Sequence, residues 1–252
     1  MTEARDSSPR VVETAAALLI GNELLSGKVR DANLERLART LRELGIRLAR
    51  VVVVPDERDT IARELRQLSD AYDVVFTSGG MGPTHDDVTV VAVAQAFDSP
   101  VVVEPRLEEI LRRWYGQRCT EAHLRMARVP AGACLAGDEY EWPAVVARNV
   151  WILPGLPEVF AEKMAIVRTH LHGPRPFCSR AVLAATEEPG LVSLLDAVVD
   201  AHPAVEVGSY PKWFDPEYKT RITFDAPDPE AVRRALEHFL SLLPSSALVR
   251  VE

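Results

Sequence analysis

The segment TSGGMGPTHDDVT, residues 77–89, sets three glycines, Gly79, Gly80 and Gly82, directly after a short apolar run. Glycines adopt backbone conformations that are closed to other residues, and they leave no side chain in the way of a ligand. Successive backbone N–H groups in such a loop can point at one anion, and the positive end of a following helix adds to the attraction. The segment therefore predicts an anion-binding loop.

Two adjacent carboxylates, Asp86 and Asp87, follow these glycines, although carboxylates repel anions. A divalent metal resolves the conflict, because carboxylates hold Mg²⁺ or Mn²⁺ and the metal in turn binds phosphate oxygens. An acidic, glycine-rich loop is thus the expected design for a nucleotide that is bound with its metal. A structural alternative stays open, in which the glycines form a tight turn and Asp86 or Asp87 caps the next helix.

The residues around this loop alternate between apolar runs and amphipathic stretches, the pattern of parallel βαβ units in an α/β fold with a mostly parallel sheet. The segment VTVVAV could be read as a strand, but Asp86 or Asp87 is a good N-cap and a parallel crossover is needed there, so residues 87–97 are predicted to be helical. The predicted strands are 14–20, 46–54 and 73–78, and a hairpin spans 145–153. Helices are expected to start near Asp31, after Asp56 and at Pro157, and two more are expected over 106–115 and 121–128.

Three polar motifs, GNELL, PDE and SGGMGPTHDD, each follow a predicted strand. Ligands of parallel sheets bind at the carboxyl ends of the strands, so these motifs are expected to meet at one edge. Glu23 and Asp56 are candidates there, with helix capping as the alternative for each. A Ser78–His85–Asp86 hydrolase triad is disfavoured, because these residues share one short loop without a G-x-S-x-G elbow.

The pattern changes after HGPRPF, residues 172–177, which reads as a linker with two prolines and a glycine. Beyond it, strands and helices follow in the order βαββαβ, typical of a small α+β domain. We therefore expect an α/β domain over residues 1–174 and a small α+β domain over residues 175–252.

The composition excludes several classes of protein. The 252 residues carry a net charge of -8, which argues against general binding to nucleic acids or membrane surfaces, since these need basic patches. Three widely spaced cysteines make neither a disulfide framework nor a CxxC metal site. The first ten residues lack the apolar stretch of a signal peptide, and no apolar run is long enough to span a membrane. A soluble cytoplasmic protein is expected.

The motifs GNELLSGKVRDAN, VVPDE, TSGGMGPTHDDVT and ILPGLPE, in this order, resemble the molybdopterin-binding-like superfamily. That superfamily includes MogA- and MoaB-type molybdopterin adenylyltransferases, the N-terminal domain of CinA and the N-terminal domain of eukaryotic FAD synthase. The likeness to the last two is greatest, because it continues past the linker into GSYPKWFDPEY. The resemblance implies a three-layer α/β core that assembles as homo-oligomers, dimers or trimers.

CinA-type and FAD-synthase-type domains look like metal-dependent pyrophosphatases of ADP-ribose or FAD, so the resemblance implies this activity first. Molybdopterin adenylyltransferase is the second hypothesis, and a non-catalytic module that binds a pterin or a nucleotide is the third. The cofactor would be Mg²⁺, Mn²⁺ or Co²⁺, with K⁺ as a further candidate. Two departures qualify the resemblance: Asn22 stands where relatives commonly carry Asp or Thr, and the further C-terminal domain of both relatives is missing. We expect the chain to act alone or with a separate partner.

The resemblance and the loop together assign these roles. Asp86 and Asp87 would hold the metal, and Asp56 would orient water. The phosphate would be bound by the amides of Gly79, Gly80 and Gly82, with Ser78 and Thr84 as further donors. Glu23 would contact the nucleotide or the metal. The PGLP turn, with Pro154 and Gly155, would close the site.

Overall fold

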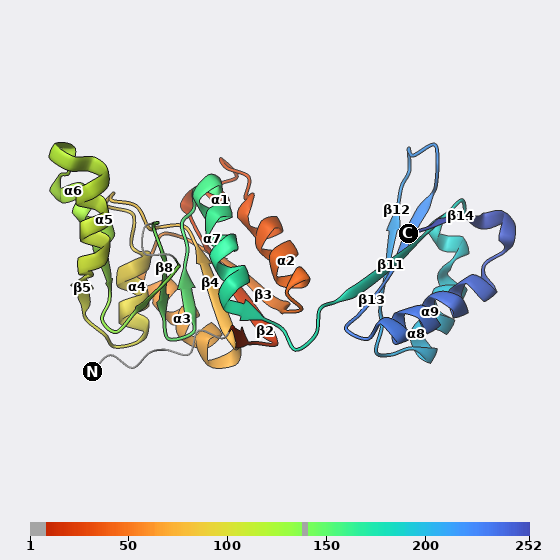
Figure 1. Ribbon diagram of the computed structural model, residues 1–252. Coiled ribbons are helices and arrows are strands. Elements are labelled where there is room, and N and C mark those ends of the chain that lie inside the picture. The colour runs from red at the N-terminus through yellow and green to blue at the C-terminus, as the bar shows by residue number, and fades with distance from the viewer. Residues whose placement is uncertain (1–8, 138–140) are drawn as a thin grey trace. The chain divides into compact units, whose positions relative to one another are not determined.

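A computed structural model of the chain describes residues 9–137 and 141–252 (Figure 1). Residues 1–8 lie outside this range. They form most of the ten-residue segment for which no signal peptide is expected. The chain divides into two compact units, residues 1–174 and residues 175–252. In the part of the chain that the structure describes, no helix has the length and apolar character needed to cross a membrane.

The main sheet of the first unit has six strands in the order β3-β2-β4-β9-β8-β7. β2, β3, β4 and β9 run parallel, while β7 and β8 pair antiparallel with their neighbours. The predicted, mostly parallel α/β sheet is confirmed. Its strands are β2 (Thr14–Ile20), β3 (Arg47–Val54), β4 (Val74–Ser78), β7 (Cys134–Ala136), β8 (Ala144–Ala147) and β9 (Val150–Ile152).

Helices cover both faces of this sheet and make three layers (Figure 1). Side chains alternate across a strand, so Leu18 of β2 packs on one face with α3, α4 and α5, while Ala17 packs on the other with α2 and α7. β2, β4 and β9, the central strands between these layers, are buried on both faces, which explains their mostly apolar sequences. The helices are α2 (Asn33–Glu43), α3 (Arg58–Ala71), α4 (Thr89–Ala96), α5 (Pro105–Tyr115) and α7 (Pro157–His170).

The ambiguous segment after the glycine loop is the helix α4, as predicted, but neither aspartate caps it. Val88 occupies the cap position, and no side chain accepts a hydrogen bond there. The capping alternative for Asp86 and Asp87 is therefore wrong. By contrast, Asp31 does cap α2, because its Oδ1 accepts a hydrogen bond from the N–H of Leu34 at 2.7 Å.

The predicted helix over 121–128 is shorter than expected. Its α-helical part, α6, ends at Leu124, and Arg128 already belongs to a strand, because Val129 pairs with Val102 and is buried. The remaining short elements of this unit are α1 (Asn22–Leu25), β1 (Arg10–Val11), β5 (Val101–Val103), β6 (Arg128–Pro130), β10 (Leu171–His172) and the 3-10 helices η1 (Gly116–Arg118) and η2 (Arg125–Ala127).

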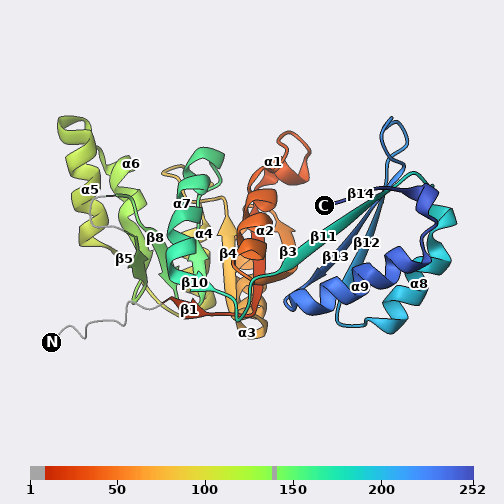
Figure 2. The ribbon, with the colours of Figure 1, turned by 45° about the vertical axis from the view of Figure 1, so that its right-hand side comes forward.

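The second unit is an antiparallel four-stranded sheet, in the order β12-β13-β11-β14, with α8 and α9 packed on one face (Figure 2). The predicted βαββαβ order is confirmed. Its core is separate from that of the first unit and centres on Phe224 and Phe239. The elements are β11 (Cys178–Ala184), η3 (Glu188–Gly190), α8 (Val192–Ala201), β12 (Glu206–Pro211), β13 (Thr220–Ala226), α9 (Pro229–Leu242), η4 (Ser245–Ala247) and β14 (Leu248–Val251).

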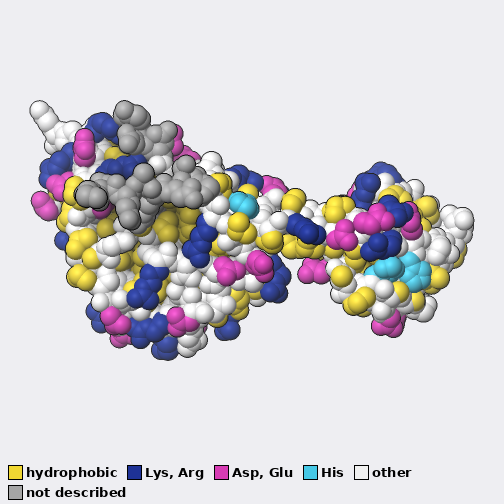
Figure 3. All heavy atoms as spheres, turned by 60° about the horizontal axis from the view of Figure 1, so that its bottom comes forward, with side chains coloured by type: hydrophobic (Ala, Val, Ile, Leu, Met, Phe, Trp, Pro, Cys, Tyr) yellow, Lys and Arg dark blue, Asp and Glu magenta, His cyan; other side chains and the backbone are white. Residues whose placement is uncertain are grey.

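Charge is interspersed over the surface rather than gathered by sign on the face shown in Figure 3, where Lys and Arg side chains alternate with Asp and Glu. That face therefore offers no basic stripe of the kind that tracks a phosphate backbone.

Candidate functional site

A cleft of about 490 Å³ opens at the carboxyl ends of the parallel strands of the main sheet. Parallel sheets place their ligand sites at this edge. The cleft is lined by nine of the candidate residues: Glu23, Asp56, Gly79, Gly80, Gly82, Asp86, Asp87, Pro154 and Gly155. Two other candidates do not line it, since Ser78 is buried beneath the loop and Thr84 is exposed beside the aspartates.

Asp56 joins the first polar loop to the second. Its Oδ2 accepts a hydrogen bond from the backbone N–H of Asn22 at 2.8 Å, and its side chain does not cap α3. The neighbouring Glu57 instead accepts from the hydroxyl of Thr60 at 3.0 Å, outside the cleft. Of the two acids in PDE, only Asp56 therefore lines the cleft.

The glycine loop depends on conformations that other residues rarely adopt. Gly79 has a φ of +112°, and a Cβ there would lie 2.1 Å from the backbone oxygen of Ile20. Gly80 has a φ of +63°, and a Cβ there would lie 2.3 Å from Oγ1 of Thr89. Gly82, by contrast, needs no positive φ. The first two glycines let the loop lie directly against the end of β2 and the first turn of α4.

The donors of the loop differ in availability. The N–H of Gly79 donates to the carbonyl of Leu153 at 3.2 Å, so the loop is anchored to the PGLP turn there. The N–H groups of Gly80, Met81 and Gly82 donate to no group in the described part of the chain. These three amides lie beside the positive end of α4 and can serve an anion.

The two aspartates are drawn together by one hydroxyl. Oγ1 of Thr84 lies 2.5 Å from Oδ1 of Asp86 and 2.6 Å from Oδ2 of Asp87, and the N–H of Thr84 donates to the same Asp87 oxygen at 2.8 Å. The hydrogen bond from Thr84 holds the pKa of Asp86 below its usual value. Both carboxylates share one hydroxyl proton, so an excess of negative charge collects at this point.

This donor set fits a divalent cation that arrives with its ligand. Among residues 9–137 and 141–252, no group of three or more His, Cys, Asp or Glu side chains is placed to hold a metal ion. Mg²⁺, however, is usually bound by only one or two carboxylates together with substrate phosphates and water. Asp86 and Asp87 supply two such carboxylates, with the free amides of the loop beside them.

Asn33, which sequence reasoning missed, holds the floor of the site. Its side chain is 2% exposed, and its Nδ2 donates to Oγ of Ser78 and to the carbonyl of Gly155, both at 2.9 Å. Ser78 thus accepts through its oxygen and keeps its own proton for another acceptor. Oδ1 of Asn33 is buried without a partner in the described structure. The sequence did carry a signal for Asn33, since this amide lies in the first turn of α2 and ends the motif GNELLSGKVRDAN.

Another part of the lining is apolar, and the sequence analysis missed it as well. Met126, Trp142, Pro143 and Val159 line it, together with Lys163 of α7. Lys163 is 3% exposed and donates to the backbone carbonyl of Trp142, and burial lowers the pKa of its amine. The signal was a lysine on the face of α7 that otherwise carries buried apolar residues.

The hydrolase triad is not formed. Ser78 is buried and bonded to Asn33, whereas the His85 side chain is almost fully exposed and lies 3.9 Å from Oδ1 of Asp86. The prediction against a triad is consistent with this geometry.

Residues 16–172 match the family described as a probable molybdopterin binding domain, and residues 176–252 match the middle domain of FAD synthase. The first match covers more than half of the chain.

Known proteins resemble the chain in sequence and in structure. It is 32% identical to a protein of Archaeoglobus fulgidus, over 89% of this chain and 95% of that one. A Caenorhabditis elegans protein named probable FAD synthase is 28% identical, over 94% of this chain and 51% of the relative, so the chain spans about half the length of that relative. A crystal structure of the protein CinA from Thermoplasma acidophilum is similar with a TM-score of 0.56 and 27% identity, covering 64% of this chain and 96% of that one.

Proposed function

The chain belongs to the family of molybdopterin-binding domains, and from this membership and the geometry of the cleft we propose that it is a metal-dependent nucleotide pyrophosphatase. One observation carries the proposal. Three unpaired backbone amides and a pair of carboxylates adjoin in one cleft, so the same site suits a phosphate and a cation. ADP-ribose and FAD, two adenylated pyrophosphates, are the proposed substrates.

The loop would bind the phosphate that is attached to adenosine. The amides of Gly80, Met81 and Gly82 would donate to its oxygens, and Gly79 would hold the loop in place through its bond to Leu153. Ser78 would add a hydroxyl donor if the phosphate reaches below the loop, because Asn33 already occupies the lone pair of its oxygen. Such fixed donors act mainly by positioning and by neutralising charge.

Asp86 and Asp87 would hold Mg²⁺, Mn²⁺ or Co²⁺, which when bound would neutralise the phosphate oxygens and lower the pKa of a coordinated water. K⁺ is a further candidate at this acidic end. Asp56 has one carboxylate oxygen on the N–H of Asn22, which leaves the other to accept a proton from water. Glu23, which also lines the cleft, would contact the ribose or the metal.

In the proposed reaction, the oxygen of water bonds to the phosphorus attached to adenosine. The P–O bond to the second phosphate breaks, its electron pair stays with the leaving phosphate, and the water proton passes to the carboxylate and then to solvent. The products are AMP and the phosphate of the other half. Catalysis of phosphoryl and nucleotidyl transfer by positioning and charge needs no covalent intermediate.

The apolar part of the cleft would take the ring of the nucleoside. Trp142, Met126 and Val159 offer flat and flexible apolar contacts, and the buried amine of Lys163 offers a donor to a ring nitrogen or a carbonyl oxygen. The PGLP turn, with Pro154 and Gly155, would close the cleft over the phosphates.

Molybdopterin adenylyltransferase is the second candidate, and the family match over residues 16–172 supports it. This enzyme would act at the same phosphate, the one attached to adenosine, but the attacking group would be a pterin phosphate in place of water. The match of residues 176–252 to the middle domain of FAD synthase favours the pyrophosphatase instead. We also propose that the chain acts in the cytoplasm as a dimer or trimer, on the resemblance alone; light scattering of the purified chain would measure its mass.

The test compares Asp87→Ala with Glu57→Gln, a neighbouring acid outside the cleft. We expect Asp87→Ala to lose metal-dependent AMP release and Glu57→Gln to retain it. Hydrolysis at the wild-type rate in a folded Asp87→Ala chain would refute the assignment. Pyrophosphate released from ATP only when molybdopterin is present would establish the transferase, and binding of either ligand without turnover would establish a binding module.

A further inference from the structure

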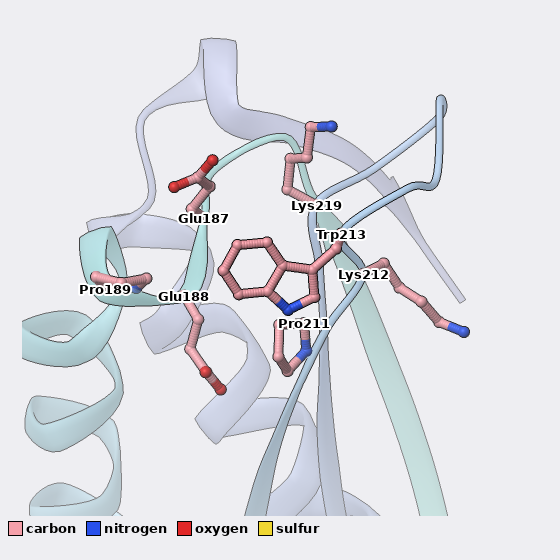
Figure 4. A pocket seen from close by; sticks show the side chains of 7 residues that line it. All are labelled: Glu187, Glu188, Pro189, Pro211, Lys212, Trp213 and Lys219. Atoms are coloured by element: carbon pink, nitrogen blue, oxygen red, sulfur yellow. The ribbon is translucent and has the colours of Figure 1, made fainter.

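A second pocket, of about 160 Å³, lies wholly within residues 175–252, between η3 and the hairpin of β12 and β13. It is lined by Glu187, Glu188, Pro189, Pro211, Lys212, Trp213 and Lys219 (Figure 4). It shares no lining residue with the cleft of the first unit.

The two walls of this pocket are tied together. The buried hydroxyl of Thr220 donates to the carbonyl of Thr186 at 2.8 Å, which links β13 to the loop before η3. The N–H of Lys219 donates to the carbonyl of Ala184 at 2.8 Å, and the N–H of Lys212 to the carbonyl of Lys219 at 2.7 Å. The pocket is therefore fixed in outline by the sheet itself and needs no ligand to form.

An unusually exposed indole forms the centre of the pocket. Trp213 is 81% exposed, whereas the large aromatic residues of the core in this unit, Phe224 and Phe239, are fully buried. Figure 4 shows the indole between Pro211 on the hairpin and the segment of Glu187 to Pro189. A flat aromatic face between prolines suits a planar ring, because aromatic side chains stack on the faces of bases.

Charges of opposite sign stand on opposite walls. Glu187 and Glu188 come from the η3 side, and Lys212 and Lys219 come from the hairpin (Figure 4). In the described parts of the chain none of these four side chains forms an ion pair or a hydrogen bond. Carboxylates accept from the amino groups of a base, and ammonium groups bind a phosphate.

We propose that this pocket is a second nucleotide site, in which the base stacks on Trp213, its amino edge faces the wall of Glu187 and Glu188, and its phosphate lies at Lys219. A nucleotide fits better than a peptide, because the exposed ring of Trp213 lies between carboxylates, which accept hydrogen bonds from a base, and ammonium groups, which bind a phosphate. The inference does not rest on the pyrophosphatase proposal, since it concerns binding in a separate unit without a metal.

The experiment measures AMP binding to the full chain by equilibrium dialysis in EDTA, where metal-dependent binding in the cleft is removed. We expect Trp213→Ala to weaken AMP binding by about 5- to 150-fold, the effect of losing one base–aromatic stack. Phe214→Ala is the matched control, because Phe214 is 99% exposed on the same hairpin but does not line the pocket. Lys219→Gln should weaken the binding of AMP but not of adenosine.

Four outcomes overturn the proposal: no binding of AMP in EDTA, equal affinity in Trp213→Ala and wild type, equal loss in Phe214→Ala, or loss of the binding in Asp87→Ala. The last outcome would assign the AMP to the cleft of the first unit. Because Trp213 is exposed, its replacement leaves the core of this unit intact, and a circular dichroism spectrum would verify folding.

Discussion

Asn33 is the residue whose replacement tests most sharply how the cleft is held together. Its amide nitrogen donates to Ser78 and to the carbonyl of Gly155, and its oxygen is buried without a partner. Asn33→Ala would remove two hydrogen bonds worth about 0.5–1.5 kcal/mol each, but also an unsatisfied oxygen that costs about 1–3 kcal/mol. The two effects are of similar size and largely cancel, so we expect the free energy of unfolding to change by no more than about 1 kcal/mol.

Asn33→Asp should cost far more, although it keeps the size and shape of the side chain. It would place a carboxylate oxygen against the carbonyl of Gly155, and Ser78 could turn its proton to only one of the two oxygens. A buried charge left without compensation costs about 3–5 kcal/mol. Asn33→Asp should therefore be less stable than Asn33→Ala by at least about 2 kcal/mol, although it changes the volume of the side chain less.

Urea unfolding in a Trp213→Phe background measures this difference, because the other three tryptophans, at 114, 142 and 151, all lie in residues 1–174. Their fluorescence then follows the first unit alone. If Asn33→Asp proves as stable as Asn33→Ala, the donated hydrogen bonds do not hold the site, and the account of Asn33 is wrong.

Three further perturbations address the loop and the apolar part of the cleft. Gly79→Ala should lower the free energy of unfolding by at least about 2 kcal/mol, because its Cβ would lie 2.1 Å from the oxygen of Ile20 at a φ of +112°; urea midpoints would check this. Thr89→Val should cost about 1–3 kcal/mol, since it leaves the carbonyl of Gly79 without its 2.8 Å hydrogen bond, while Thr89→Ser should retain the bond; equal losses in the same assay would argue against it. Burial lowers the pKa of Lys163 from 10.5, so between the pKa of the folded state and 10.5 the unfolded chain binds more protons than the folded chain. The free energy of unfolding therefore rises with pH through that window. Lys163→Met should flatten this rise, measured as urea midpoints against pH, and an unchanged slope would mean that Lys163 is not the titrating group.

The periodicity of apolar residues was sufficient for most of the fold. β2 is apolar throughout because both of its faces are covered, and α2 and α3 repeat their apolar residues at helical spacing. The segment of α4 was harder, since its β-branched residues suit a strand. The helix was favoured by the need for a crossover and by an expected cap at Asp86 or Asp87, which the structure does not form. The end of α6 could not be predicted, because Val129 leaves the helix to pair with Val102, a residue distant in sequence.

The location of the acidic and glycine candidates was predictable, because they follow strands whose carboxyl ends meet at one edge of the sheet. Asp56, Asp86, Asp87 and the glycines all line the cleft, as the order of strands implies. Asn33 and Lys163 were harder to predict, because each sits on a helix. Lys163 lines the cleft, and Asn33 contacts Gly155 of its lining, only through tertiary packing. The bond from Gly79 to Leu153 is also tertiary, and it moves the free donors of the loop to Gly80, Met81 and Gly82.

The release of AMP by the purified chain tests the central proposal most directly. The chain would be incubated with ADP-ribose or FAD in EDTA, and then with Mg²⁺, Mn²⁺ or Co²⁺. The account predicts AMP from at least one of these substrates only when a metal is added. No AMP from either substrate with any of the metals would contradict it.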